Sequence, residues 1–157
     1  MCMKKSRYIL WIAAVEFVGI LSFLLSCQGM VLYRETVRKP PLTPPGIVFG
    51  IVWTVLYALM AIGAARVDAA PDSRARQRAL NEFIIQLTLN FFWSLIFFNV
   101  RRYGLALLCL AILWVFVVRM ISAFRKTDSP AAWLQIPYLV WVTFAVYLNY
   151  GVWILNP

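Results

Sequence analysis

The chain has 157 residues, of which 63% are hydrophobic and only 13% are charged. A soluble domain is typically about half apolar and about a quarter charged, so the apolar excess is too large for one small core and indicates a lipid bilayer as solvent. The net charge is +9 with no histidine. Because the basic residues stand in short clusters between apolar runs, they argue against nucleic-acid binding and for loops at a membrane surface. The three cysteines, Cys2, Cys27 and Cys109, have no metal-ligand spacing and predict neither a disulfide framework nor a metal site.

Five apolar stretches follow one another along the chain, at residues 8–27, 46–67, 80–100, 103–124 and 132–155. Each has about 20 residues, which at about 1.5 Å per residue span a hydrocarbon core of about 30 Å. The short connections between them make consecutive helices antiparallel neighbours. The sequence therefore predicts an all-α protein, a single domain over residues 1–157 that is a membrane-spanning bundle of five transmembrane helices.

The basic residues fall unequally on the two sides of this predicted bundle. The N-terminal side collects Lys4, Lys5, Arg7, Arg66, Arg74, Arg76, Arg78, Arg125 and Lys126, and the other side collects Arg34, Arg38, Lys39, Arg101 and Arg102. The positive-inside rule then places the N-terminus in the cytoplasm. Helical spans also favour the bacterial inner membrane over the outer one.

The third span carries the most informative face. Gln86, Asn90, Trp93 and Phe97 follow one another at i, i+4, i+7 and i+11, which places them on one side of a helix. Such a face either joins helices through interhelical hydrogen bonds or forms the wall of a cavity for a flat apolar ligand. The spans contain no pair of carboxylates and no nucleophile beside a base, so neither a conventional hydrolase nor a proton relay is predicted.

The second and fifth spans also carry aromatic residues on one face, here together with small residues. Four residues of the second span share a face: Gly46, Gly50, Trp53 and Tyr57. The glycine pair predicts close packing, either inside the bundle or between two copies. A stripe of the fifth span holds Pro137, Trp141, Ala145 and Leu148, with Tyr138 and Asn149 beside it. Pro137 lies inside the predicted helix and predicts a kink there.

Four motifs, in order along the chain, carry a resemblance to a known family. They are Lys39-Pro40 with Thr43-Pro44-Pro45-Gly46; Trp53-Thr54-Val55-Leu56-Tyr57; Gln86-Leu87 with Asn90, Trp93, Phe97 and Phe98; and Pro137-Tyr138-Leu139-Val140-Trp141 with Phe144-Ala145 and Tyr147-Leu148-Asn149. From Tyr33 onward the chain resembles bacterial members of the translocator protein family, also called tryptophan-rich sensory proteins or peripheral benzodiazepine receptors. Each motif is weak alone, but four in order on five spans are specific.

The resemblance implies a five-helix fold, a homodimer, and a cavity that opens toward the proline-rich loop. It implies a receptor that binds protoporphyrin IX as a ligand rather than a cofactor, together with other flat hydrophobic molecules, in porphyrin transport or stress sensing. The positions that match the family's cavity are Trp53, Asn90, Trp93, Tyr138, Trp141, Phe144, Ala145 and Leu148. Tyr57, Gln86 and Phe97 on the same faces, and Arg38, Lys39, Pro44 and Pro45 of the loop, complete the predicted site.

Two other functions stay open. Some family members promote light-dependent breakdown of protoporphyrin, which is attributed to cavity tryptophans; Trp53 matches one of them, but Tyr150 stands where the other is expected, so an enzyme is the less favoured hypothesis. The other alternative to a receptor is a transporter or structural partner that does not bind porphyrin. The chain further departs from the family at Leu42 and Cys109, and it has no Lys or Arg after Tyr150, so the sterol motif of animal members is not matched.

The residues themselves favour a metal-free porphyrin. Haem usually takes an axial His, Cys, Met or Tyr, and the predicted cavity faces offer aromatic rings and amides instead. Arg34, Arg38 and Lys39 of the first connection are placed to meet the carboxylates of such a ligand, or alternatively to contact lipid headgroups.

Overall fold

The computed structural model describes residues 2–157, with side chains from Lys5 onward, so the side chains of Cys2 and Lys4 lie outside the described part. Within it the chain forms helices and no strand: α1 (Cys2–Thr36), α2 (Gly46–Asp68), α3 (Arg74–Leu95), η1 (Ile96–Val100), α4 (Tyr103–Thr127), α5 (Ser129–Trp133) and α6 (Ile136–Leu155). Five helical segments are long and apolar enough to cross a membrane. The predicted all-α bundle of five spans is therefore confirmed.

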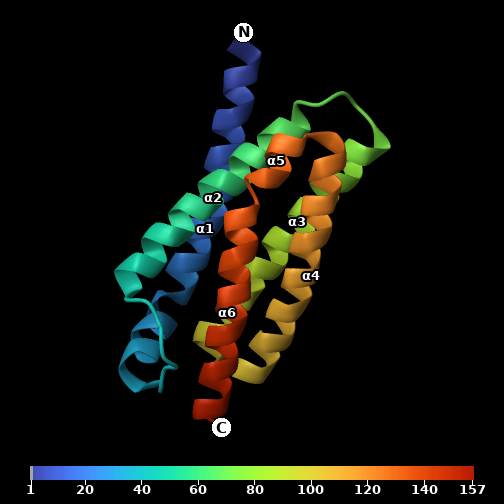
Figure 1. The fold of residues 1–157 in the computed structure, drawn as a ribbon. Helices are drawn as coiled ribbons and strands as arrows, with labels where there is room; N and C mark the ends of the chain where they lie inside the picture. Colours follow the sequence, from blue (N-terminus) through green and yellow to red (C-terminus); the bar gives the residue numbers. More distant parts are fainter. Residues whose placement is uncertain (1) are drawn as a thin grey trace.

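The helices run side by side in an elongated bundle with the two termini at opposite ends (Figure 1). α4 packs against α3 on one side and α6 on the other, while α1 packs against α2, α3 and η1. α2 touches α6 only sparsely, so the bundle is closed mainly through α3 and α4. The loop that joins α1 to α2, residues 37–45, lies at the C-terminal end of the bundle (Figure 1).

Two helices are longer than their apolar stretches. α1 continues past Cys27 to Thr36, and α3 begins at Arg74, where the Ser73 hydroxyl accepts a hydrogen bond from the Arg76 amide at 3.1 Å. An apolar run marks only the part of a helix that crosses hydrocarbon, whereas capping decides where the helix begins and ends. The extension of α1 supplies one wall of the cavity described below.

The inner face of α1 is made of small residues, and this allows close packing. A side chain at Gly19 would meet the Tyr57 ring of α2 at 2.6 Å, and one at Gly29 would meet the backbone carbonyl of Phe98. Between them, the buried Ser26 hydroxyl shares a 3.1 Å hydrogen bond with that of Ser94 on α3. α1 is thereby held against both α2 and the end of α3.

The prediction of a kink at Pro137 is wrong, because the chain breaks into two helices just before this residue. The fifth span is two helices, α5 and α6, and Pro137 lies in the first turn of α6, where its missing N–H removes no helical hydrogen bond. Gln135 occupies the break, and its Nε2 donates to the carbonyls of Ala131 (3.2 Å) and Leu59 (3.3 Å). Gly63 of α2 has no side chain to keep Gln135 away, so the break in the span is buried against α2.

The prediction that Gly46 and Gly50 pack closely does not hold inside the bundle. A side-chain carbon added at either residue would meet nothing within 4 Å. These two glycines therefore differ from Gly19, Gly29 and Gly63, each of which has a neighbour in its way.

Candidate functional site

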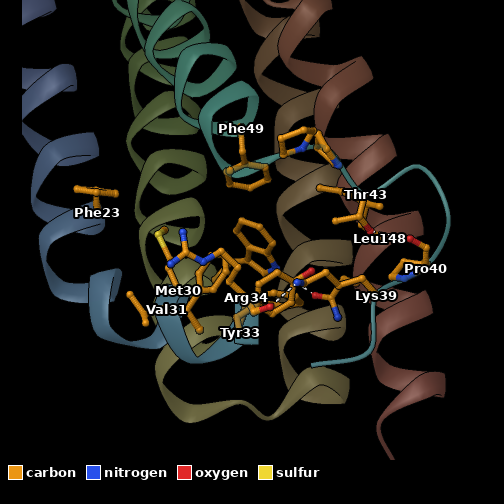
Figure 2. A pocket seen from close by; sticks show the side chains of 18 of the residues that line it. Phe23, Met30, Val31, Tyr33, Arg34, Lys39, Pro40, Thr43, Phe49 and Leu148 are labelled. Carbon is orange, nitrogen blue, oxygen red and sulfur yellow. Dashed lines mark hydrogen bonds between the residues drawn. The ribbon is translucent and has the colours of Figure 1, made fainter. Parts of the chain in front are cut away.

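A cavity of about 870 Å³ lies at the loop end of the bundle (Figure 2). Its size is within the range of about 300–1,000 Å³ that is typical of small-molecule sites. α1 contributes Phe23, Cys27, Met30, Val31, Tyr33 and Arg34, and the loop contributes Lys39, Pro40, Leu42, Thr43, Pro44 and Pro45. The rest of the wall is Gly46 and Phe49 of α2, Trp93, Phe97 and Phe98 of α3 and η1, and Ala145, Leu148 and Asn149 of α6.

Seven residues of the predicted site line this cavity: Lys39, Pro44, Pro45, Trp93, Phe97, Ala145 and Leu148. The indole of Trp93 is fixed, because its Nε1 donates to Asn149 Oδ1 at 3.1 Å and Asn149 in turn donates to the Tyr103 carbonyl at 2.8 Å. A tryptophan held in this way presents a rigid aromatic surface to any molecule in the cavity.

The segment η1 explains how two successive phenylalanines, Phe97 and Phe98, both reach the wall. η1 is the last turn of the third span and is capped at its C-terminus by Arg101, whose φ of 56° is left-handed. The rings pack on each other with centroids 4.9 Å apart, and both contact Tyr33 of α1. Asn99 anchors the segment by donating from Nδ2 to the Leu25 carbonyl at 2.8 Å. η1 thereby joins α3 to α1 at the cavity.

Four predicted residues, Tyr57, Gln86, Asn90 and Tyr138, do not line the cavity but form a buried hydrogen-bonded chain. The Tyr57 hydroxyl donates to Asn90 Oδ1 at 2.8 Å, and Asn90 Nδ2 donates to the Tyr138 hydroxyl at 3.1 Å. That hydroxyl donates to Gln86 Oε1 at 2.9 Å. Of the two alternatives for this face, the structure thus assigns its amides to interhelical bonding.

Trp53, Trp141 and Phe144 form an aromatic layer next to the cavity rather than its surface. Phe49 lines the cavity and packs on both indoles, with centroid distances of 6.1 Å to Trp53 and 5.7 Å to Trp141. Phe144 packs behind Trp141 at 5.6 Å. The buried Trp141 Nε1 has no hydrogen-bond partner among the described residues.

The loop is fastened onto α6. The backbone N–H of Arg38 donates to Asn156 Oδ1 at 3.0 Å, the Asn156 amide donates back to the Arg38 carbonyl at 2.9 Å, and the Tyr147 hydroxyl donates to the Pro41 carbonyl at 3.1 Å. The Arg38 side chain, which was part of the predicted site, does not line the cavity.

Lys39 connects the loop to α1. Its Nζ donates to the Arg34 carbonyl at 2.7 Å and lies 5.4 Å from the centre of the Tyr33 ring (Figure 2). Arg34 and Lys39 are the charged residues of the described wall, and both are cations. The cavity therefore combines an apolar wall that includes several aromatic rings with two exposed cations at its mouth.

The sequence analysis missed the α1 wall, apart from Arg34, and it also missed Phe49 of α2. The first span was expected to end at Cys27, yet Cys27, Met30, Val31 and Arg34 continue one helical face at i, i+3, i+4 and i+7. That spacing was the available signal. The same stretch of α1 also brings Cys27, Met30 and Tyr33 to a cavity that was expected to offer aromatic rings and amides rather than soft ligands for haem.

Five apolar membrane-spanning segments around a cavity of this size define an integral multi-pass membrane protein with room for a small molecule. The TspO/MBR family model matches residues 11–154, and the chain belongs to this family. The resemblance that the four motifs carried is thereby confirmed.

Bacterial and animal relatives are similar over most of their length. Tryptophan-rich protein TspO of Chlorobaculum tepidum is 37% identical over 126 residues, which cover 80% of each chain. Protein CrtK of Rhodobacter capsulatus is 36% identical over 126 residues, 80% of this chain and 79% of that protein. The translocator protein of Ovis aries is 32% identical over 152 residues, 91% of this chain and 89% of that protein.

Proposed function

We propose that the protein is a membrane receptor for tetrapyrroles such as protoporphyrin IX, with a role in porphyrin transport or stress sensing. The observation that carries the proposal is the combination, in one cavity of about 870 Å³, of aromatic walls and two cations at the mouth. A flat macrocycle with carboxylates along one edge matches this cavity, because its rings would lie against the aromatic walls and its carboxylates would lie near the two cations.

The wall supplies rings from three directions, with Tyr33 from α1, Phe49 from α2, and Trp93, Phe97 and Phe98 from α3 and η1. Aromatic rings at centroid separations of about 4.5–7 Å attract each other beyond the burial of their surface, so a planar ligand inserted among them is favoured. Arg34 and Lys39 would then form charge-assisted hydrogen bonds with the carboxylates.

The direct test is a titration of protoporphyrin IX into detergent-purified protein, followed by tryptophan fluorescence. We expect saturable quenching, because Trp93 lies on the wall and Trp53 directly behind it. Quenching that never saturates would contradict the proposal. A parallel titration with haem, read in its visible spectrum, would show whether Cys27, Met30 or Tyr33 ligates iron.

Receptor function is favoured over light-dependent porphyrin breakdown. Tyr150 does not line the cavity and its side chain is exposed, so it offers no second redox-active group beside Trp53. Illumination of the bound complex should leave the porphyrin absorbance unchanged. Bleaching with a new product would instead establish the enzyme.

We further propose a homodimer in the bacterial inner membrane with a cytoplasmic N-terminus, which places the cavity mouth on the opposite side. The excess of Lys and Arg at the N-terminal end of the bundle supports this orientation. Reporter fusions at the C-terminus, active only when exported, test the orientation, and cross-linking in the membrane tests the dimer.

A further inference from the structure

The cavity has an open side between α1 and the first turns of α2. Phe23 and Val31 of α1 line the cavity and yet keep 56% and 47% of their surface exposed, and Leu42 of the loop keeps 78%. Residues that both line a cavity and remain exposed form its rim. Along Phe23, Val31 and Leu42 the rim is apolar, which suits contact with hydrocarbon, whereas the exposed Arg34 and Lys39 make another part of the rim positive.

The face of α2 that meets α1 changes character along its length. Tyr57, Trp53, Gly50 and Gly46 share this face, and the Tyr57 ring fills the space beside Gly19 of α1. Beyond Trp53, toward the loop, the same face carries only glycine, and a side chain at Gly50 or Gly46 would meet nothing within 4 Å. The two helices therefore touch at Tyr57 and leave a slot beyond it.

Nothing polar or aromatic bridges this slot. In the part of the chain that the structure describes, no side-chain hydrogen bond and no pair of packed rings joins residues 22–34 of α1 to residues 46–53 of α2. In the view of Figure 2, Phe23 and Val31 stand on the α1 side of the cavity and Phe49 on the α2 side. The loop side, by contrast, is fastened to α6 by three hydrogen bonds.

Gly50 carries a cost that packing does not explain, because it lies in the interior of α2, whereas Gly46 is the first residue of that helix. Glycine in a helix interior destabilises by roughly 0.5–1 kcal/mol relative to alanine. The other described glycines stand where a side chain would collide or press on a neighbour: Gly19, Gly29, Gly63, Gly104 and Gly151. Gly46 lines the cavity and Gly50 follows one turn deeper in the helix, so a space kept free for passage accounts for the glycine at position 50.

We propose that the slot between Phe23, Cys27 and Val31 of α1 and Gly46 and Gly50 of α2 is a lateral portal through which an anionic amphiphile enters the cavity from the bilayer. This inference rests on the proposed receptor function. The apolar body of the ligand passes between the helices at hydrocarbon depth, while its carboxylates stay near Arg34 and Lys39 at the membrane surface. The ligand thus never leaves the membrane, and the aqueous end stays covered by the loop.

The test is the rate at which protoporphyrin IX, preloaded into the bilayer of donor vesicles, quenches tryptophan fluorescence of the protein in acceptor nanodiscs. Gly50→Trp places an indole in the slot without lining the cavity, and Ile51→Trp places the same indole on a neighbouring lipid-facing position as the matched control. Gly50→Leu is a milder plug in case the indole hinders folding.

We expect Gly50→Trp to slow association roughly tenfold with little change in Kd, Gly50→Leu to slow it less, and Ile51→Trp to match wild type. Equal rates in all four proteins, with normal affinity, would overturn the portal and leave the receptor function standing. Absence of saturable quenching in wild type would overturn the receptor function itself. A change from dimer to monomer in Gly50→Trp, measured by mass photometry, would assign the slot to a contact between copies and also overturn the portal.

Discussion

The two ends of the bundle differ in how their charged residues are used. At the N-terminal end, here called the tied end, Asp68 accepts from Arg76 at 2.6 Å and from Trp11 at 3.2 Å, and its carbonyl accepts from Arg7 at 2.8 Å. At the cavity end, Arg34 and Lys39 have no carboxylate partner among the described residues. Charges paired with each other join helices, whereas charges left without a counter-ion beside a cavity are available to a ligand.

The glycines differ within the cavity end itself. Gly29 and Gly151 lie against Phe98 and Pro40, as Gly63 near the tied end lies against Gln135, whereas Gly46 and Gly50 face open space. The open space at the cavity end is therefore confined to the first turns of α2. The difference between the two ends can be tested. Substitutions at the tied end should lower stability without changing ligand affinity, and substitutions at the cavity mouth should lower ligand affinity without changing stability.

The largest effect is expected for Tyr138→Phe, in the buried layer between the two ends. The change leaves Gln86 Oε1 and Asn90 Nδ2 without their partner in a dry environment, and we expect a loss of about 3 kcal/mol in unfolding free energy. Thermal unfolding in detergent measures it. Affinity for protoporphyrin IX should change little in the protein that remains folded, and a large loss of affinity at unchanged stability would place Tyr138 in the ligand site instead.

Asp68→Asn tests the tied end itself. The substitution removes the charge that joins Arg7 of α1 and Arg76 of α3, and we expect a loss of about 1–2 kcal/mol, intermediate between exposed and buried ion pairs. The melting temperature should fall while the Kd for protoporphyrin IX stays constant. Asp72→Asn is the matched control, because that carboxylate is mostly exposed and pairs with Arg76 alone among these cations.

At the cavity mouth we expect Arg34→Gln and Lys39→Gln each to raise the Kd for protoporphyrin IX about five- to tenfold, since each loses one charge-assisted contact. Stability should be nearly unchanged. Arg38→Gln is the internal control, because its backbone is bonded to Asn156 and its side chain does not line the cavity. Equal losses in all three variants would indicate a diffuse surface potential rather than specific contacts.

The smallest effect is a pH dependence at Asp128, which caps α5 and pairs with Arg66. Burial by itself raises the pKa of this carboxyl, but the hydrogen bonds from Arg66 and from the Ala131 N–H outweigh it and hold the pKa below its ordinary value of 3.8. A pKa lowered by folding contributes stability that is complete above the unfolded pKa and is lost as the pH falls through the folded pKa.

Asp128→Asn keeps a good N-cap and loses the ion pair, so we expect it to cost no more than about 1 kcal/mol at neutral pH. Its difference in melting temperature from wild type should shrink as the pH is lowered below about 4. A difference that stays constant with pH would show that the charge of Asp128 contributes nothing.

The sequence predicted the architecture well, because long apolar runs and their short polar breaks are direct consequences of the bilayer. It placed Trp93, Phe97, Ala145 and Leu148 on the faces that line the cavity, since helical periodicity alone decides which residues share a side. The sequence did not predict that α1 lines the cavity. That helix ends at Thr36 rather than Cys27, and past Cys27 it packs against η1 at Gly29.

The sequence also could not predict how far each residue lies from the cavity. Tyr57, Asn90 and Tyr138 share faces with cavity residues, and only the structure shows that they bond to each other one layer away. Spacing gives the side of a helix but not the distance between helices. For the same reason, the break at Gln135 could not be foreseen from Pro137, because it depends on the absence of a side chain at Gly63 on another helix.

The most direct test of the central claim, that the cavity bounded by α1, the loop and α6 binds a tetrapyrrole, is protoporphyrin IX binding to Ala145→Phe. Ala145 is buried on the cavity wall, whereas Ala111 is exposed on α4 and provides the control variant Ala111→Phe. We predict saturable quenching of tryptophan fluorescence in wild type and Ala111→Phe and its loss in Ala145→Phe, with all three folded. Unchanged saturable binding in Ala145→Phe would contradict the claim.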